Sequence, residues 1–237
     1  MNKSLIPSKE IPHPLLNLQG QERKKFVIRS IFITTSMTLF IYVIFPNYYI
    51  LESSITQSSV SVLDLFGFQS RVFVYEDSFQ DVSSLDRFLI KLYDPTRATY
   101  PAISMDTASG RSNYLIVRAC TGMQAGGLLL GLIWATPATL HDRIRSSYVM
   151  LISLYIGNIL RIAAQIGMTL VLINYFDLEY ETAWSYAHDW TGKPIGFFGT
   201  IAFTVLIEVR NVRILDTITV WVDFVIGAKP KTVVAKS

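Results

Sequence analysis

The 237-residue chain has few charges and a single cysteine. Only 16% of its residues are charged, whereas a soluble domain usually has about 25%. One cysteine, Cys120, excludes an intramolecular disulfide and a four-cysteine metal site. The net charge of +3 is too slight and too dispersed to indicate nucleic-acid binding. No glycine-rich phosphate loop follows a predicted strand, so neither a cofactor nor a nucleic-acid partner is expected.

Hydrophobic residues take the place of the missing charges, since they make up 51% of the chain. A membrane-spanning helix needs about 20 mostly apolar residues. Four runs are candidates, namely 26–45, 121–138, 147–173 and 195–209, the last expected to begin near Thr191. The sequence therefore predicts an all-α polytopic membrane protein with about four transmembrane helices.

If the chain crosses the membrane four times, three clusters of basic residues fall on one side. The clusters contain Arg23, Lys24, Lys25, Arg143, Arg145, Arg210 and Arg213. Cytoplasmic loops carry such an excess of basic residues, so this side is predicted to be cytoplasmic. The prediction is a multi-pass protein of the cell membrane, with its N-terminus inside and the long segment 46–119 outside.

Distinct regions are expected along the chain. Residues 1–25 form an irregular cytoplasmic tail without the features of a cleaved signal peptide. Residues 26–213 form the membrane domain, with an extracytoplasmic insertion at about 46–119. Residues 214–237 form a C-terminal amphipathic helix and a basic tail. Within this last region, 214–228 favours an interfacial helix over a fifth span, because two aspartates seven residues apart share one helical face.

The insertion is expected to contain both helix and strand. Residues 48–68 have the pattern of an amphipathic helix lying near the membrane surface, with a partial span as the alternative. Residues 71–76 and 113–118 are β-branched and aromatic, which predicts two strands that could pair in a small β-sheet. The polar stretch 77–112 between them carries no clear pattern.

One predicted span carries a polar face. Arg161 lies in the middle of the third apolar run, and Asn158 and Gln165 stand three residues before it and four residues after it. Ionisable residues inside spans are rare and usually functional. All three share one helical face, which must face the other helices or a wet cavity. The alternative is a structural arginine that pairs with backbone carbonyls.

Cys120 and His188 are both predicted to lie on the outer side of the membrane. Cys120 begins the second apolar run, and His188 is the only one of the three histidines predicted outside. Taken singly, a cysteine is often a small buried hydrophobic residue, and a loop histidine is often solvated. Together with Arg161, however, the two residues come from three consecutive predicted spans and lean toward the outer leaflet.

This set of residues has a coherent chemistry. A thiolate is a strong nucleophile, and nearby positive charge favours it. His188 can accept the thiol proton and later return it to a leaving amine. Arg161 can stabilise the thiolate or an oxyanion. Thr121 and Gly122 permit a tight turn after Cys120, and a helix beginning there would add positive potential at the sulfur.

Asp189 directly follows His188 and could orient its ring. The sole cysteine and the outer histidine otherwise have only Glu179 and Glu181 as neighbouring acidic residues. A metal site built from these side chains is an alternative, but no metal-ligand spacing recommends it. No metal ion is therefore expected.

Three sequence blocks resemble motifs of the exosortase/archaeosortase family of membrane transpeptidases. "ACTG" at 119–122 is similar to the family's nucleophile motif at the start of a span. "GNILRIA" at 157–163 is similar to its Asn-x-x-Arg block, and "HDWTG" at 188–192 to its histidine block before the following span. The blocks stand in the family's order, and the resemblance covers about residues 50–210.

The resemblance implies a catalytic triad of Cys120, Arg161 and His188 and an acyl-enzyme thioester intermediate. It implies that the substrates are exported proteins whose C-terminal tail combines a short motif, a transmembrane helix and a basic cluster. Cleavage near the motif would be followed by transfer of the new C-terminus to an amine on a membrane lipid. The short chain resembles the compact archaeal type more than the bacterial exosortases.

Two further alternatives stay open at this point. One is a hydrolytic intramembrane cysteine protease that releases the acyl group to water. The other is a membrane scaffold without catalytic activity, whose polar helix face binds a partner helix. The same side chains would serve in each case, so the sequence does not separate them.

Overall fold

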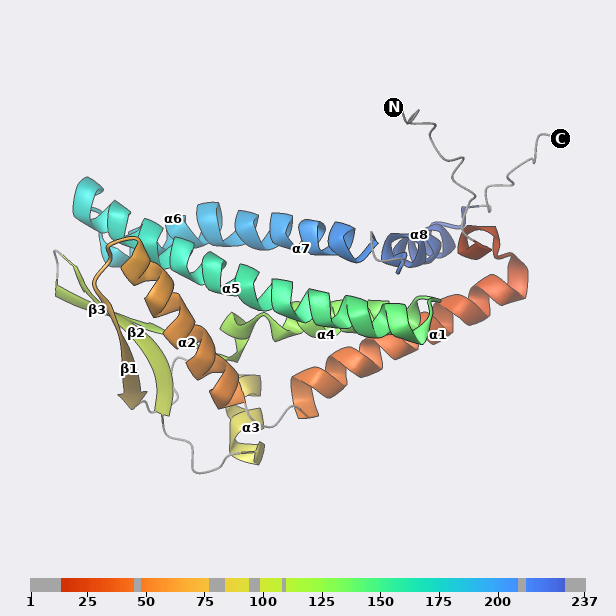
Figure 1. Ribbon diagram of the computed structural model, residues 1–237, viewed down its shortest axis with the longest axis horizontal. Coiled ribbons are helices and arrows are strands. Elements are labelled where there is room, and N and C mark those ends of the chain that lie inside the picture. The colour runs from red at the N-terminus through yellow and green to blue at the C-terminus, as the bar shows by residue number, and fades with distance from the viewer. Residues whose placement is uncertain are drawn as a thin grey trace, which may run out of the picture.

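A computed structural model describes residues 14–44, 48–76, 84–93, 99–107, 110–208 and 212–228. Within these residues the chain is mostly helical and has one three-stranded sheet. Figure 1 shows long helices lying side by side, with the sheet at one end and helix α8 (Ile214–Val225) at the other. We call these the sheet end and the α8 end.

Three helical stretches are long and apolar enough to cross a membrane, namely Gly20–Tyr42, Leu140–Phe176 and Tyr180–Glu208. The first is α1 (Gly20–Leu39) with a π-helical extension, and the second is α5. Their large exposed side chains include Phe32 and Ile152, which suit contact with lipid. The chain is therefore a helical membrane protein.

The third stretch begins earlier than the sequence predicts. Helix α6 (Tyr180–Ala187) continues through the π-helical turn His188–Gly192 into α7 (Lys193–Glu208). The expected start at 195, or near Thr191, is therefore wrong. The polar residues before 195 resemble a loop in sequence, but they form helical turns whose side chains reach water or the other helices.

The second predicted span, 121–138, is a shorter helix than expected. Helix α4 (Met123–Ala135) has 13 residues, about 20 Å at the helical rise, whereas the hydrocarbon core of a bilayer is about 30 Å thick. It lies beside α1 and α5 (Figure 1). A Cβ atom at Gly131 would stand only 2.7 Å from Thr34 Cα, so the backbones of α1 and α4 touch there. Three helices of spanning length and a shorter fourth therefore form the bundle within the described residues.

The N-terminal region is less irregular than predicted for 1–25. Residues 14–17 form a 3-10 turn (η1), and α1 already begins at Gly20, whereas residues 1–13 lie outside the described part. The polar first turns of α1 are held by α8 and the residues after it, because Arg23 lies 4.0 Å from the Asp223 carboxylate and donates a 2.7 Å hydrogen bond to the Ala228 carbonyl. A tertiary contact thus lengthens the helix beyond its apolar run.

The sheet has the order β1-β2-β3, with both neighbouring pairs antiparallel. Its strands are β1 (Ser70–Glu76), β2 (Thr99–Thr107) and β3 (Gly110–Leu115). The two predicted strands belong to one sheet, as expected, but they do not pair with each other because β2 lies between them. The unassigned stretch 77–112 holds β2 and a short helix, α3 (Ser84–Tyr93).

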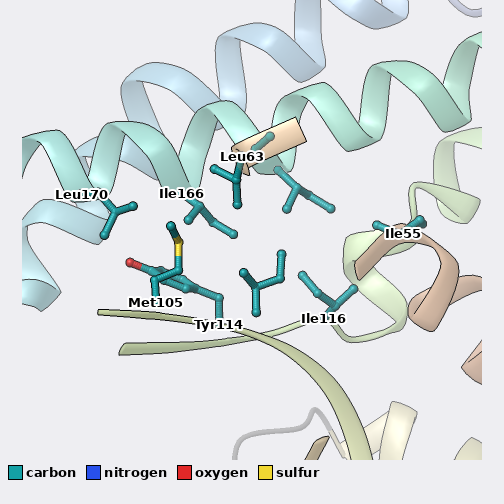
Figure 2. Close-up of a cluster of buried hydrophobic side chains, with 10 residues drawn as sticks. Ile55, Leu63, Met105, Tyr114, Ile116, Ile166 and Leu170 are labelled. Carbon is teal, nitrogen blue, oxygen red and sulfur yellow. The ribbon is translucent and has the colours of Figure 1, made fainter. Parts of the chain in front are cut away.

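Helix α2 (Tyr48–Leu65) confirms the helix expected over 48–68, but it packs against the sheet and α5 rather than lying alone. Figure 2 shows the cluster in which one face of the sheet meets α2 and α5. The buried members are Ile55, Leu63, Ile103, Met105, Tyr114, Ile116, Ile162, Ala163, Ile166 and Leu170. This core fixes the sheet against residues 162–170 of α5.

At the opposite end, α8 packs on α1 and η1. Its 12 residues extend about 18 Å, less than the roughly 30 Å of a bilayer's hydrocarbon core, and α8 is not among the three helices long enough to span. The Trp221 indole donates a 2.6 Å hydrogen bond to Ser30 Oγ of α1. Within α8, Asp216 is buried and forms a 2.9 Å ion pair with Arg213.

Candidate functional site

A cavity of about 620 Å³ lies at the sheet end, between β3, α5 and α6. Cys120, Arg161 and His188 all line it, although they come from three separate elements. Its full lining is Asn113, Tyr114, Leu115, Ile116, Val117, Cys120, Arg161, Ile162, Gln165, Ile166, Tyr180, Trp184 and His188. The volume is within the range of small-molecule pockets.

Cys120 lies in a 3-10 turn, η3 (Arg118–Thr121), and not in the first turn of α4 as expected. Gly122 follows with φ +71°, a left-handed conformation that glycine adopts without strain. This residue separates the cysteine from α4. The buried Thr121 hydroxyl donates to the Arg118 carbonyl at 2.7 Å and so closes the turn.

Asn158 of α5 contacts η3, the turn that contains Cys120. Its Nδ2 donates a hydrogen bond to the Cys120 backbone carbonyl. A Cβ atom at Gly122 would meet the Asn158 side chain at 3.5 Å, so the turn and the amide lie in contact. Asn158 is therefore a positioning residue, and it does not itself line the 620 Å³ cavity.

Arg161 follows Asn158 by one helical turn and lies in the wall between two cavities. The second cavity is smaller, about 140 Å³, and lies between α4, α5 and α7. The Arg161 Nε atom is buried and has no hydrogen-bond partner among the described residues. Buried polar atoms in native structures almost always have a partner, so a donor of this kind is available to a bound molecule.

Gln165, the third member of the polar face, is buried and lines the large cavity. A Cβ atom at Gly192 would stand 2.8 Å from its Oε1 atom. A side chain at position 192 would displace the Gln165 amide, so glycine lets the turn after His188 approach α5 while Gln165 keeps its observed place. The "HDWTG" block thus contributes a close helix contact as well as a histidine.

His188 is half exposed, and its ring forms a hydrogen bond with the side chain of the next residue, Asp189. Its Nδ1 atom lies 3.0 Å from Asp189 Oδ1. The Asp189 carboxylate also forms a 2.8 Å ion pair with Lys193. If the Nδ1 atom carries the proton in this bond, Nε2 is the basic nitrogen. The carboxylate therefore favours one tautomer of the ring and fixes its orientation.

Three aromatic rings form one wall of the cavity. The Tyr114 ring centroid lies 5.9 Å from that of Tyr180 and 5.4 Å from that of Trp184. Burial, and secondarily the nearby Tyr180, raises the pKa of the Tyr114 phenol above its usual range. Its hydroxyl is thus a neutral donor at physiological pH, buried and without a hydrogen-bond partner among the described residues. Sequence reasoning missed this residue because Tyr114 fits a strand pattern equally well as a core residue.

Arg118 is a second residue that sequence reasoning missed. Its side chain is buried two residues before Cys120. The guanidinium donates to the Tyr42 carbonyl at 3.2 Å and stacks over the Tyr48 ring at 4.0 Å. It therefore joins η3 to the end of α1 and the start of α2. In the sequence, the only signal was the position of an arginine two residues before the cysteine.

Within the part of the chain that the structure describes, no group of three or more His, Cys, Asp or Glu side chains could hold a metal ion. Comparisons of the chain with protein-family models, curated proteins and solved structures found no match. Fold and site together define a helical membrane protein with a cavity at the sheet end of its bundle, lined by apolar and aromatic residues together with Cys120, Arg161 and His188.

Proposed function

We propose that this protein is a membrane-embedded cysteine transpeptidase that cleaves the C-terminal tails of exported proteins. The observation that carries the proposal is that Cys120, Arg161 and His188 line one cavity, although they are far apart in sequence. They also occur in the three blocks that resemble the exosortase/archaeosortase family. Neither the topology argument nor the resemblance used the cavity, so it supports the proposal independently.

The proposed reaction begins when His188 accepts the Cys120 proton and the thiolate attacks a peptide carbonyl carbon. Arg161 stabilises the oxyanion that forms. Collapse breaks the C–N bond, and His188 gives its proton to the leaving amine. The product is a thioester on Cys120. An acceptor amine then attacks the thioester, its proton passes to His188, and the thiolate leaves.

The acceptor in this proposal is an amine on a membrane lipid. The cavity lies toward the sheet end of the bundle, and its site in the bilayer would be toward the outer leaflet if the basic flanks face the cytoplasm. A peptide tethered by its own transmembrane helix and a lipid headgroup would both reach this depth. Water is the competing acceptor, and it would give a free carboxylate.

The test is processing of a reporter protein that carries a motif–helix–basic tail, co-expressed in membranes with this protein or its Cys120→Ala variant. Parent protein should shorten the reporter, and the variant should leave it intact. Mass spectrometry of the new C-terminus distinguishes a lipid adduct from a free carboxylate. Ser30→Ala, at the α8 end, serves as the matched control for a small change that should not affect processing. Equal processing by Cys120→Ala would refute the proposal.

A further inference from the structure

Strand β3 is at the edge of the sheet. Its pairing partner in the described sheet is β2 alone. The Ile116 amide donates to the Pro101 carbonyl at 2.9 Å, which marks these two as a hydrogen-bonded position in the same register. Because such positions alternate along antiparallel strands, Asn113 and Leu115 direct their N–H and C=O groups away from β2.

The large cavity runs along this edge. Residues 113 to 117 line it one after another. Successive strand side chains point to opposite faces of a sheet, so a cavity beside one face would be lined by alternate residues. Five consecutive lining residues place the cavity beside the edge of the strand. The chain then continues directly into η3, which carries Cys120.

Side-chain groups at the same edge also lack partners. Tyr114 is only 4% exposed, and its hydroxyl has no hydrogen-bond partner among the described residues. The Asn113 Oδ1 atom is likewise buried and without a partner there. A neutral donor and a neutral acceptor next to an unpaired strand edge match the groups of an uncharged peptide backbone.

We propose that the cavity binds an extended polypeptide segment, which joins the sheet as a fourth strand beside β3 and leads a peptide bond to Cys120. A helical segment does not fit this role, because its backbone groups bond one another and cannot pair with the strand edge. The aromatic wall of Tyr114, Tyr180 and Trp184 favours an apolar side chain on the bound segment. The binding of an extended segment beside β3 does not depend on the proposed function. Only the statement that Cys120 meets the peptide bond to be cleaved rests on it.

Binding is measured without turnover. The probe is a biotinylated mixture of ten-residue peptides of randomised sequence with blocked termini, captured by the full-length Cys120→Ala protein in lipid nanodiscs. Failure of this protein to retain any peptide overturns the inference. If the Cys120→Ala protein retains peptide but the parent protein cleaves no reporter, the proposed function is overturned and the binding inference stands.

Leu115→Pro is the decisive variant. Proline removes the outward N–H at this position and leaves the bonds to β2 in place, and edge strands tolerate it. Loss of the hydrogen bond from the residue 115 N–H, and the poorer fit of the peptide beside the proline ring, should weaken capture about tenfold. Leu115→Val keeps the N–H and should retain capture within about twofold. Arg111→Pro changes another outward position, one that does not line the cavity, and should also retain capture. Equal capture by Leu115→Pro, or equal losses in Leu115→Val, overturns the inference.

Amide hydrogen exchange on the Cys120→Ala protein tests the same point without a strand variant. On addition of the peptide mixture, the amides of Asn113 and Leu115 should exchange about tenfold more slowly, because they gain partners. The Tyr114 amide, which already bonds to β2, should change little. Unchanged exchange at Asn113 and Leu115 in protein that has captured peptide contradicts strand pairing.

Discussion

The two ends of the helical bundle differ in what surrounds their buried polar groups. At the α8 end, the Trp221 indole bonds Ser30 of another helix. The buried Ser146 Oγ and Arg143 Nε atoms at this end, which have no partner among the described residues, do not border the large cavity. At the sheet end, the Tyr114 hydroxyl and the Arg161 Nε atom are buried around a cavity without partners in the described part of the chain. Unsatisfied buried groups destabilise a fold and persist where function needs them. We therefore expect changes at the sheet end to alter activity and changes at the α8 end to alter stability.

The largest effect is expected from Arg161→Lys. Lysine keeps the positive charge but loses the planar set of donors. Removal of an oxyanion donor costs about 10²–10³-fold in rate, so reporter processing should fall by that factor. The unfolding temperature should stay close to that of the parent protein. Full processing by Arg161→Lys would show that charge alone, and not donor geometry, is needed there.

Asp189→Asn should have the next largest effect on activity. The change removes the carboxylate that lies 3.0 Å from His188 Nδ1, and a charge-assisted bond of this kind is worth about tenfold in rate. Initial rates of reporter processing measure it. Lys193→Met is the control, since it breaks the 2.8 Å ion pair with Asp189 but leaves the bond to histidine. A tenfold loss in Lys193→Met as well would assign the effect to the ion pair.

Trp221→Phe tests the α8 end. It removes the 2.6 Å bond between the indole and Ser30 and should lower the free energy of unfolding by about 1 kcal/mol. Chemical denaturation in detergent micelles measures this loss. Reporter processing at a temperature well below the unfolding transition should be unchanged. Impaired processing without a loss of stability would remove the distinction between the two ends.

The smallest effect is expected from Gly192→Ala, compared with Gly199→Ala. A Cβ atom at Gly192 would meet Gln165 Oε1 at 2.8 Å, whereas one at Gly199 meets Phe203 at 3.8 Å. The first change should shift Gln165 and reduce processing about threefold, which is about 0.7 kcal/mol. The second should be neutral for processing and should slightly favour the helix. Equal rates in both variants would indicate that the Gln165 amide is not needed in its observed place.

The sequence predicts the apolar helices well, because each long apolar run is a local property. The set of Cys120, Arg161 and His188 was also predictable, since span order and basic flanks place each of them near the same end of the helices. Their entry into one cavity could not be derived, because it depends on how α4, α5 and α6 pack. The roles proposed for them in catalysis stay predictions.

Long-range contacts account for what the sequence did not reveal. Strand β2 contains Pro101 and has an almost wholly buried run instead of an alternating pattern, so its pairing with both neighbours was not visible. Arg118 resembled a surface charge because its partners, Tyr42 and Tyr48, come from segments about 70 residues earlier. The polar "HDWTG" block resembled a loop because its close contact with Gln165 exists only after folding.

The contact between Gly131 and Thr34 has a consequence for how the protein is made. At about 20 Å, α4 is too short to partition into a bilayer as an independent span. Backbone contact with α1 gives it a protein surface in place of lipid, so α4 should enter the membrane only after α1 is there and together with α5, which follows after a short turn. A bulky residue at position 131 would then appear first as a defect of insertion during translation, before the finished fold could be affected.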